Sequence, residues 1–140
     1  MTTSASLAES ARAHRGLNTA LWVAQVLLAA AFVMAGSMKM MTSSADLAQQ
    51  MPDLPVALIR FIGIAEIAGA IGLILPAATR IRPALTPLAA IGLAVIMLLA
   101  GAFHLSRGEL SSLPVVFALG GLALFVAWGR SRKVPILPRG

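Results

Sequence analysis

Residues 56–75 read VALIRFIGIAEIAGAIGLIL, an apolar run of 20 residues with only two ionisable side chains, Arg60 and Glu66. A helix of this length rises about 30 Å, which matches the hydrocarbon thickness of a bilayer. A carboxylate inside such a helix costs about 2.5 kcal/mol or more to insert, so it usually faces a protein partner or a cavity. The run therefore predicts a transmembrane helix whose acidic side chain points into a helical bundle.

Three further apolar runs flank this one, at residues 17–41, 83–104 and 113–129. Hydrophobic residues form 59% of the 140-residue chain and charged residues only 11%, whereas a soluble domain carries about 25% charged residues. Short connections make neighbouring helices antiparallel. We therefore predict an all-α fold, an integral membrane up-down-up-down four-helix bundle that occupies residues 17–130. The first run is expected to be retained rather than removed as a signal peptide.

The distribution of charge favours a membrane over nucleic acid as the partner of this basic chain. Its net charge is +6, from eleven Lys and Arg against five Asp and Glu. Eight basic residues gather on one side of the predicted membrane: Arg12, Arg15, Arg80, Arg82, Arg130, Arg132, Lys133 and Arg139. Because short basic loops remain cytoplasmic, both termini are expected on that side of a bacterial cytoplasmic membrane. Residues 1–16 would form a frayed surface helix or a disordered segment there, and residues 131–140 a basic tail.

The absence of cysteine and the small number of histidines exclude several kinds of catalytic and metal site. The sequence has no cysteine, which excludes disulfides, thiolate catalysis and iron–sulfur ligation. Its two histidines, His14 and His104, are predicted on opposite sides of the membrane, so no metal site and no bis-histidine haem are expected. No glycine-rich dinucleotide or phosphate loop is present. A redox role would therefore require a bound cofactor or a partner subunit.

Small residues accompany the carboxylate of the second span. Gly63, Glu66, Gly69 and Ala70 recur at intervals of three or four residues, so they share one helix face. Small residues let helix backbones approach closely in lipid, which would make Glu66 a buried structural acid. They would equally shape a pocket around a ligand-binding or catalytic carboxyl. The sequence leaves both interpretations open.

The first span carries a second row of candidate residues at heptad-like spacing: Gln25, Ala29, Phe32, Gly36 and Lys39. If this row meets the second span, Gln25 lies near the depth of Glu66 and becomes a candidate hydrogen-bond donor to it. Lys39 is then the candidate counter-ion, because Arg60 lies on a different face of its own helix from Glu66. The alternatives are an interhelical hydrogen bond for Gln25 and extension of the two cationic side chains to the membrane surface.

His104 closes the third span on the same outer side as Lys39. It shares a helix face with Met97, Ala100 and Gly101, so small residues again lie beside a polar one. A histidine at this depth is either an ordinary interfacial residue or a hydrogen-bond donor and proton relay for a bound quinone.

These stretches together resemble the DoxX-like family of small four-helix membrane proteins. The likeness covers about residues 21–130 and rests on the segments 36–39, 60–66, 69–76 and 86–90, followed by His104. The resemblance implies a four-helix membrane bundle. It implies function only loosely, because the family is named after a subunit of an archaeal thiosulfate:quinone oxidoreductase and includes proteins of redox, stress-defence and assembly systems.

Three functions are compatible with these observations. The first is an accessory subunit of a membrane redox or stress-response assembly that binds a lipophilic molecule, such as a quinone cofactor. Its ligand-binding residues would be Gln25, Phe32, Gly36, Arg60, Gly63, Gly69, Met97 and Gly101. The second is a membrane-embedded isomerase or cyclase for an isoprenoid or epoxide, with Glu66, His104 and Lys39 as catalytic residues. The third is a membrane assembly factor or homo-oligomer.

Overall fold

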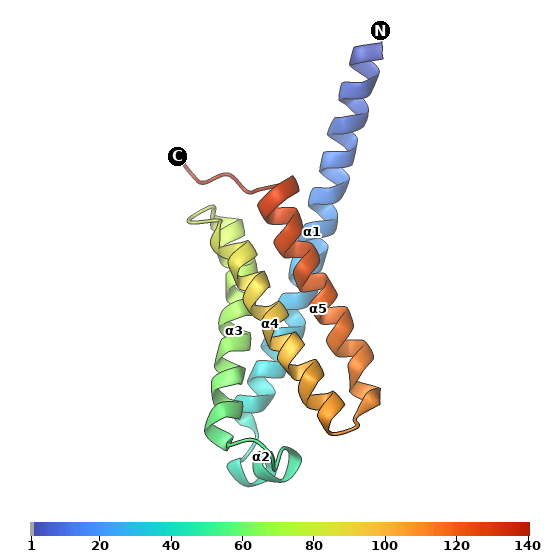
Figure 1. Ribbon diagram of the computed structural model, residues 1–140. Coiled ribbons are helices and arrows are strands. Elements are labelled where there is room, and N and C mark those ends of the chain that lie inside the picture. The colour runs from blue at the N-terminus through green and yellow to red at the C-terminus, as the bar shows by residue number, and fades with distance from the viewer. Residues whose placement is uncertain (1) are drawn as a thin grey trace.

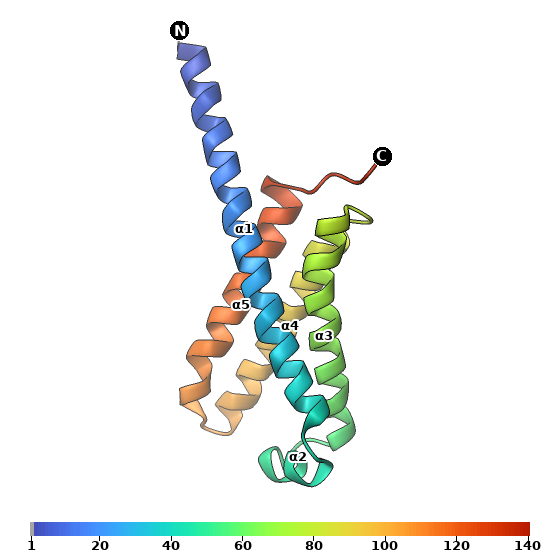
Figure 2. The ribbon, with the colours of Figure 1, turned by 180° about the vertical axis from the view of Figure 1, so that it is seen from behind.

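The computed structural model describes residues 2–140, in which four long helices run in up-down-up-down order (Figures 1 and 2). These are α1 (Thr2–Met41), α3 (Val56–Thr79), α4 (Leu85–Ser106) and α5 (Leu113–Trp128). A short helix, α2 (Ser44–Gln50), and a 3-10 turn, η1 (Leu110–Ser112), lie in the connections, and a π-helical turn, η2 (Gly129–Lys133), follows α5. The predicted four-helix bundle is confirmed, and all four of its helical segments are long and apolar enough to cross a membrane.

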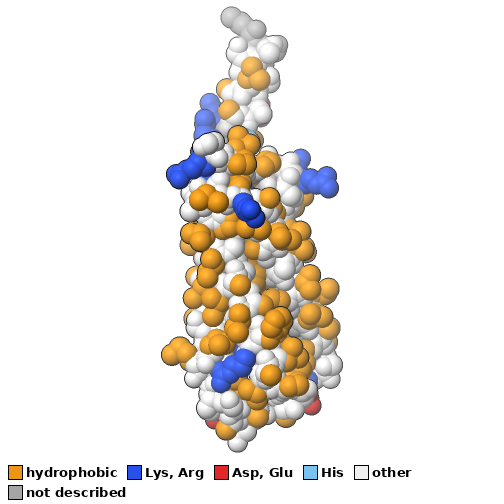
Figure 3. Space-filling view, turned by 90° about the vertical axis from the view of Figure 1, so that its left-hand side faces the viewer, with side chains coloured by type: hydrophobic (Ala, Val, Ile, Leu, Met, Phe, Trp, Pro, Cys, Tyr) orange, Lys and Arg blue, Asp and Glu red, His pale blue; other side chains and the backbone are white. Residues whose placement is uncertain are grey.

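The two ends of the bundle differ in composition. Both termini and the α3–α4 connection lie at the upper end in Figure 1, which we call the terminal end. The opposite end holds α2 and the α4–α5 turn, and we call it the α2 end. On the face drawn in Figure 3, Lys and Arg side chains gather toward the terminal end, and hydrophobic side chains cover most of the middle. This distribution suits an apolar middle zone in contact with lipid.

Helix α1 begins at Thr2, well before the predicted start at Leu17. Residues 3–16 are helical and exposed, and this part of α1 projects beyond the bundle (Figures 1 and 2). The segment contains four alanines and no proline, which favours a continuous helix over the frayed or disordered segment considered from sequence. With 40 residues, α1 rises about 60 Å. Met1, the first residue of the predicted N-terminal segment, lies outside the described residues.

Pro76 lies inside α3 and does not end it, although the sequence predicted an end at Leu75. Proline has no N–H, so the carbonyl four residues earlier, at Gly72, loses its intrahelical donor. Thr86 of α4 replaces that donor, with its Oγ1 3.1 Å from the Gly72 oxygen. Because hydrocarbon supplies no water to a free carbonyl, this bond from the neighbouring helix lets α3 continue to Thr79.

Gln25 of α1 donates a hydrogen bond to the carbonyl of Leu73, the residue after Gly72 in α3. The buried Gln25 amide donates from Nε2 to the Leu73 oxygen at 2.6 Å. The candidate bond from Gln25 to Glu66 is therefore not formed, because Leu73 lies about two helical turns closer to the terminal end than Glu66. Gln25 instead makes an interhelical hydrogen bond, which was the alternative. Side chains from α1 and α4 thus fasten to the α3 backbone just before Pro76.

One apolar cluster joins the four helices. Its buried members come from α1, α3, α4 and α5: Ala24, Leu28, Phe32, Ala70, Leu73, Ala90, Leu93, Met97, Val116, Ala123, Val126 and Ala127. Two residues that the sequence analysis considered for ligand binding, Phe32 and Met97, belong to this cluster. In this structure Phe32 is enclosed in the core, whereas Met97 packs in the core and also borders a groove on the outer surface of the bundle.

We expect Thr86→Val to destabilise the protein by about 1 kcal/mol, because it leaves the partly buried Gly72 carbonyl without a donor. Pro76→Ala restores an N–H four residues after Gly72, so Thr86→Val should cost less than half as much in that background. Thermal or denaturant unfolding in detergent micelles measures both costs. Thr79→Val is the control, since the exposed Thr79 hydroxyl donates only to the Leu75 oxygen of its own helix and accepts only from the backbone N–H of Ile81. Equal costs of Thr86→Val in the two backgrounds would contradict the assignment.

Candidate functional site

Glu66 of α3 and Lys39 of α1 form an ion pair between the two helices. Lys39 Nζ lies 2.9 Å from Glu66 Oε2 and 3.2 Å from Oε1, so the ammonium donates to both carboxylate oxygens. The Glu66 side chain is 4% exposed and the Lys39 side chain 21%. The inward direction of Glu66 and its pairing with Lys39 are as predicted. The Lys39 ammonium bonds Glu66 inside the bundle rather than extending away from it, as the alternative required.

The antiparallel arrangement of α1 and α3 explains how these side chains meet. A helical side chain leans toward the N-terminus of its own helix. Lys39 starts near the α2 end of α1 and leans toward the middle of the bundle, whereas Glu66 starts deeper and leans toward the α2 end. The two charged groups therefore converge at a depth between their backbones.

Glycines bring α1 and α3 together beside this pair. A Cβ on Gly36 would lie 2.6 Å from the Gly63 oxygen, and a Cβ on Gly63 would lie 3.0 Å from Lys39 Cβ. A Cβ on Gly69 would lie 2.6 Å from Leu93 Cδ2 of α4. The missing side chains thus admit neighbouring helices. The packing interpretation of the small residues accounts for all three positions.

Arg60 holds the end of α1 from which Lys39 projects. Its guanidinium donates to the main-chain oxygens of Lys39, Met40 and Thr42, the last two at 2.7 Å. The final carbonyls of a helix lack intrahelical donors, and a cation is favourable at that end of the helix dipole. Arg60 therefore positions the Lys39 backbone. Both of its terminal nitrogens, Nη1 and Nη2, donate in this contact.

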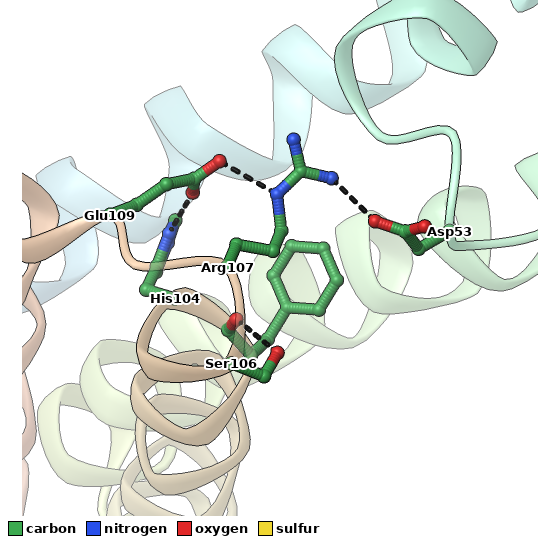
Figure 4. A network of polar contacts seen from close by, with 6 residues as sticks. Asp53, His104, Ser106, Arg107 and Glu109 are labelled. Atoms are coloured by element: carbon green, nitrogen blue, oxygen red, sulfur yellow. Dashed lines mark hydrogen bonds and ion pairs between the residues drawn. The ribbon is translucent and has the colours of Figure 1, made fainter.

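His104 belongs to a separate network at the α2 end (Figure 4). Its Nδ1 lies 2.7 Å from Glu109 Oε2, and Arg107 Nε donates to Glu109 Oε1 at 2.7 Å. Arg107 also donates to Asp53 at 2.8 Å, which ties the α4–α5 turn to the α2–α3 connection. Among the described residues, no hydrogen bond or ion pair joins His104 to Lys39 or Glu66. The two predicted donors share an end of the bundle but each has its own carboxylate.

The network shifts the pKa of both charged residues of the α4–α5 turn. The hydrogen bond to His104, followed by that from Arg107, lowers the pKa of Glu109. The hydrogen bond to Glu109 in turn raises the pKa of Arg107. The ionised carboxylate is thus the form that the folded turn stabilises.

Arg130 is the residue that the sequence analysis did not single out. It was counted among the surface cations, yet it is only 3% exposed and donates from Nε to Gln25 Oε1 at 2.7 Å. Gly129 beside it allows α5 to contact Leu21 of α1. The sequence did contain a signal for this burial. Gly129 precedes Arg130 at the end of one span, and Gln25 lies at the corresponding depth of another.

Three shallow grooves open on the outer surface of the bundle. They lie between α3 and α4 (650 Å³), between α4 and α5 (410 Å³) and between α1 and α3 (580 Å³), and their linings are almost wholly apolar. Gly69 lines the first, and Met97 and Gly101 line the second. Glu66, Lys39 and His104 line none of the three.

The sequence model of the DoxX-like family matches residues 23–127. This range includes α3 and α4 in full, α5 except its last residue, and most of the membrane-spanning part of α1. No curated protein and no solved structure matched the chain.

We expect Lys39→Met to destabilise the protein by about 3 kcal/mol, because it leaves the buried Glu66 carboxylate without a counter-ion. The double variant Lys39→Met/Glu66→Leu should recover most of that loss, since an apolar pair of similar volume replaces a buried ion pair at little cost. Thermal unfolding in detergent measures both. If the double variant loses as much stability as Lys39→Met and Glu66→Leu lose together, the two side chains do not interact.

The pH dependence of stability should report the Glu109 network. A carboxyl whose folded pKa is lowered stabilises the protein above its ordinary pKa of 4.5 and loses that contribution as the pH falls through the folded value. The unfolding temperature should therefore fall more steeply between about pH 5 and pH 3 in the natural protein than in Glu109→Gln. Glu9→Gln, on the exposed part of α1, should keep the steep slope. Parallel curves for natural protein and Glu109→Gln would contradict the network.

Proposed function

Because the chain belongs to the DoxX-like family, we propose that it is a ligand-binding integral membrane protein whose ligand is a lipophilic carbonyl compound such as a quinone. The observation that carries the proposal is the asymmetry of the ion pair, in which Lys39 is 21% exposed and Glu66 only 4%. A ligand at the bundle surface would meet the ammonium and not the carboxylate.

The chemistry of Lys39 suits a carbonyl oxygen. An ammonium has three N–H donors, and the bonds to the two Glu66 oxygens leave one free. The Glu66 carboxylate balances the charge, so the ligand need not be an anion. Arg60 and the Gly36–Gly63 contact fix the position of this donor, which lowers the entropy cost of binding.

The apolar tail of such a ligand would lie in the groove between α1 and α3. This groove is lined by α1 residues up to Met34, which is five residues, or about 7 Å of helix rise, from Lys39. Its α3 wall is formed by Ala70, Ile71 and Ile74. An isoprenoid chain in this groove would place its head group near the ammonium.

The geometry gives less support to an acid–base enzyme. Both oxygens of Glu66 already accept hydrogen bonds from Lys39, and Glu66 lines none of the three surface grooves. His104 is engaged by Glu109. We therefore assign Lys39 to the ligand and Glu66 to the orientation and charge balance of Lys39.

The cellular setting in this proposal follows the charge distribution and the family. Basic residues crowd the terminal end, which supports a cytoplasmic location for both termini in a bacterial membrane. The protein would then act as an accessory subunit of a membrane redox or stress-response assembly. Its ligand site would lie nearer the opposite membrane surface.

Quinone titration of the purified protein tests the proposal. Short-chain ubiquinone and menaquinone analogues should bind saturably, and Val33→Trp, which fills the α1–α3 groove, should weaken binding by at least about tenfold. Val95→Trp is the matched control, because Val95 is similarly exposed on α4 and lines none of the three grooves. Absence of saturable binding, together with a lipid extract free of quinone, would overturn the proposal. Turnover of an isoprenoid or epoxide that Glu66→Gln abolishes would favour the enzyme instead.

A further inference from the structure

A second buried charge lies at the terminal end, far along the bundle from the Lys39–Glu66 pair. The Arg130 guanidinium donates to Gln25 Oε1 and Asn18 Oδ1 at 2.7 Å each, and to the Val134 oxygen at 3.2 Å. All of these acceptors are neutral. Its Nη2 is buried and has no hydrogen-bond partner within residues 2–140. The arginine is 3% exposed, so solvent does not compensate its charge.

Among residues 2–140, no acidic side chain bonds this arginine. Four of the chain's five acidic side chains are already bonded elsewhere: Asp46, Asp53, Glu66 and Glu109. The fifth, Glu9, lies on the projecting part of α1, nine residues before Asn18, which corresponds to about 13 Å of helix rise. A buried cation without a counter-ion is costly, so a compensating anion is expected from outside the chain.

Two tryptophans place this arginine at headgroup depth. The Arg130 Cζ lies 5.3 Å from the ring centre of Trp22, and Lys133 Nζ lies 5.7 Å from that of Trp128. These are the only tryptophans of the sequence. Indole rings concentrate at the boundary between hydrocarbon and water, where the phosphates of phospholipids lie. A lipid phosphate is therefore the anion expected at the depth of Arg130.

We propose that Arg130 is the centre of a binding site for the phosphate of an anionic phospholipid at the terminal end. Nη2 is the donor that remains for the phosphate. Arg15 lies one turn before Asn18 on the same face of α1, so it adds a second cation above Arg130. The surrounding end of the bundle is rich in Lys and Arg, which favours an anionic over a zwitterionic lipid.

The local backbone suits such a site. Arg130 belongs to the π-helical turn η2, and π turns are rare and frequently occur at functional positions. Within this turn Arg130 points inward while Arg132 is exposed. The Trp22 ring, which is only partly buried, covers the guanidinium, so a tilt of this interfacial indole opens the way to Nη2.

Thermal unfolding of the full chain in detergent, with added phosphatidylglycerol, tests the site. Phosphatidylglycerol should raise the unfolding temperature by about 5 °C, whereas diacylglycerol with the same acyl chains, which lacks the phosphate, should not. Arg130→Gln should abolish the shift, and Arg132→Gln, which removes an exposed charge from the same turn, should preserve it. Inorganic phosphate should give a much smaller shift. A shift as large as that of the lipid would overturn the assignment to a headgroup.

Asn18→Asp keeps the proposal testable if Arg130→Gln does not fold. This change is nearly isosteric and puts a carboxylate 2.7 Å from Arg130 Nη1, so the chain then supplies its own counter-ion. We expect the variant to unfold at a higher temperature than the natural protein without lipid, and to lose at least half of the phosphatidylglycerol shift. A full shift in Asn18→Asp would overturn the proposal. So would equal shifts in Arg130→Gln and Arg132→Gln, since both outcomes indicate attraction to the basic surface as a whole.

Discussion

Hydrocarbon offers no water to an unpaired polar group, and helix α3 brings several such groups into the bundle. Its Glu66 carboxylate requires a cation, and the Gly72 carbonyl that Pro76 leaves free requires a donor. Lys39 of α1 and Thr86 of α4 meet these requirements, while Gln25 of α1 donates to the adjacent Leu73 carbonyl. The polar groups of α3 therefore determine which neighbours it has and at what depth they bind, and the apolar core fills the space between these contacts.

The sequence predicted the fold because four apolar runs of membrane-spanning length, joined by short connections, allow few other arrangements. It also predicted the Lys39–Glu66 pair, since a carboxylate inside a span needs a cation from a neighbouring helix. It misplaced Gln25, because backbone depth alone neglects the length of the lysine side chain. Once Lys39 leans inward to reach Glu66, α1 is set so that Gln25 meets Leu73. The burial of Arg130 depends on how closely α5 approaches α1 at Gly129. This contact involves two helices, so the sequence of either span alone does not predict it.

The partly buried Lys39 and the buried Arg130 are balanced in different ways. The charge of Lys39 is neutralised within the chain, so the ligand that we propose for this end need not carry a charge. The Arg130 guanidinium contacts only neutral oxygens and an indole ring, so its charge is not balanced by these contacts. We therefore place an anion at this end. Because Gln25 bonds both Leu73 and Arg130, the arginine is joined to the α3 backbone near Pro76 through a single amide.

Helix α1 runs from Thr2 to Met41 without a proline or a break, so its exposed part and its membrane-spanning part form one stiff rod. A rod of this kind acts as a lever. Torque or tilt applied to the protruding arm is delivered to the region of Lys39 with no joint between them to absorb it. A partner that binds residues 3–16 and tilts them would therefore also displace Lys39 relative to Glu66, because Lys39 lies near the other end of the same helix.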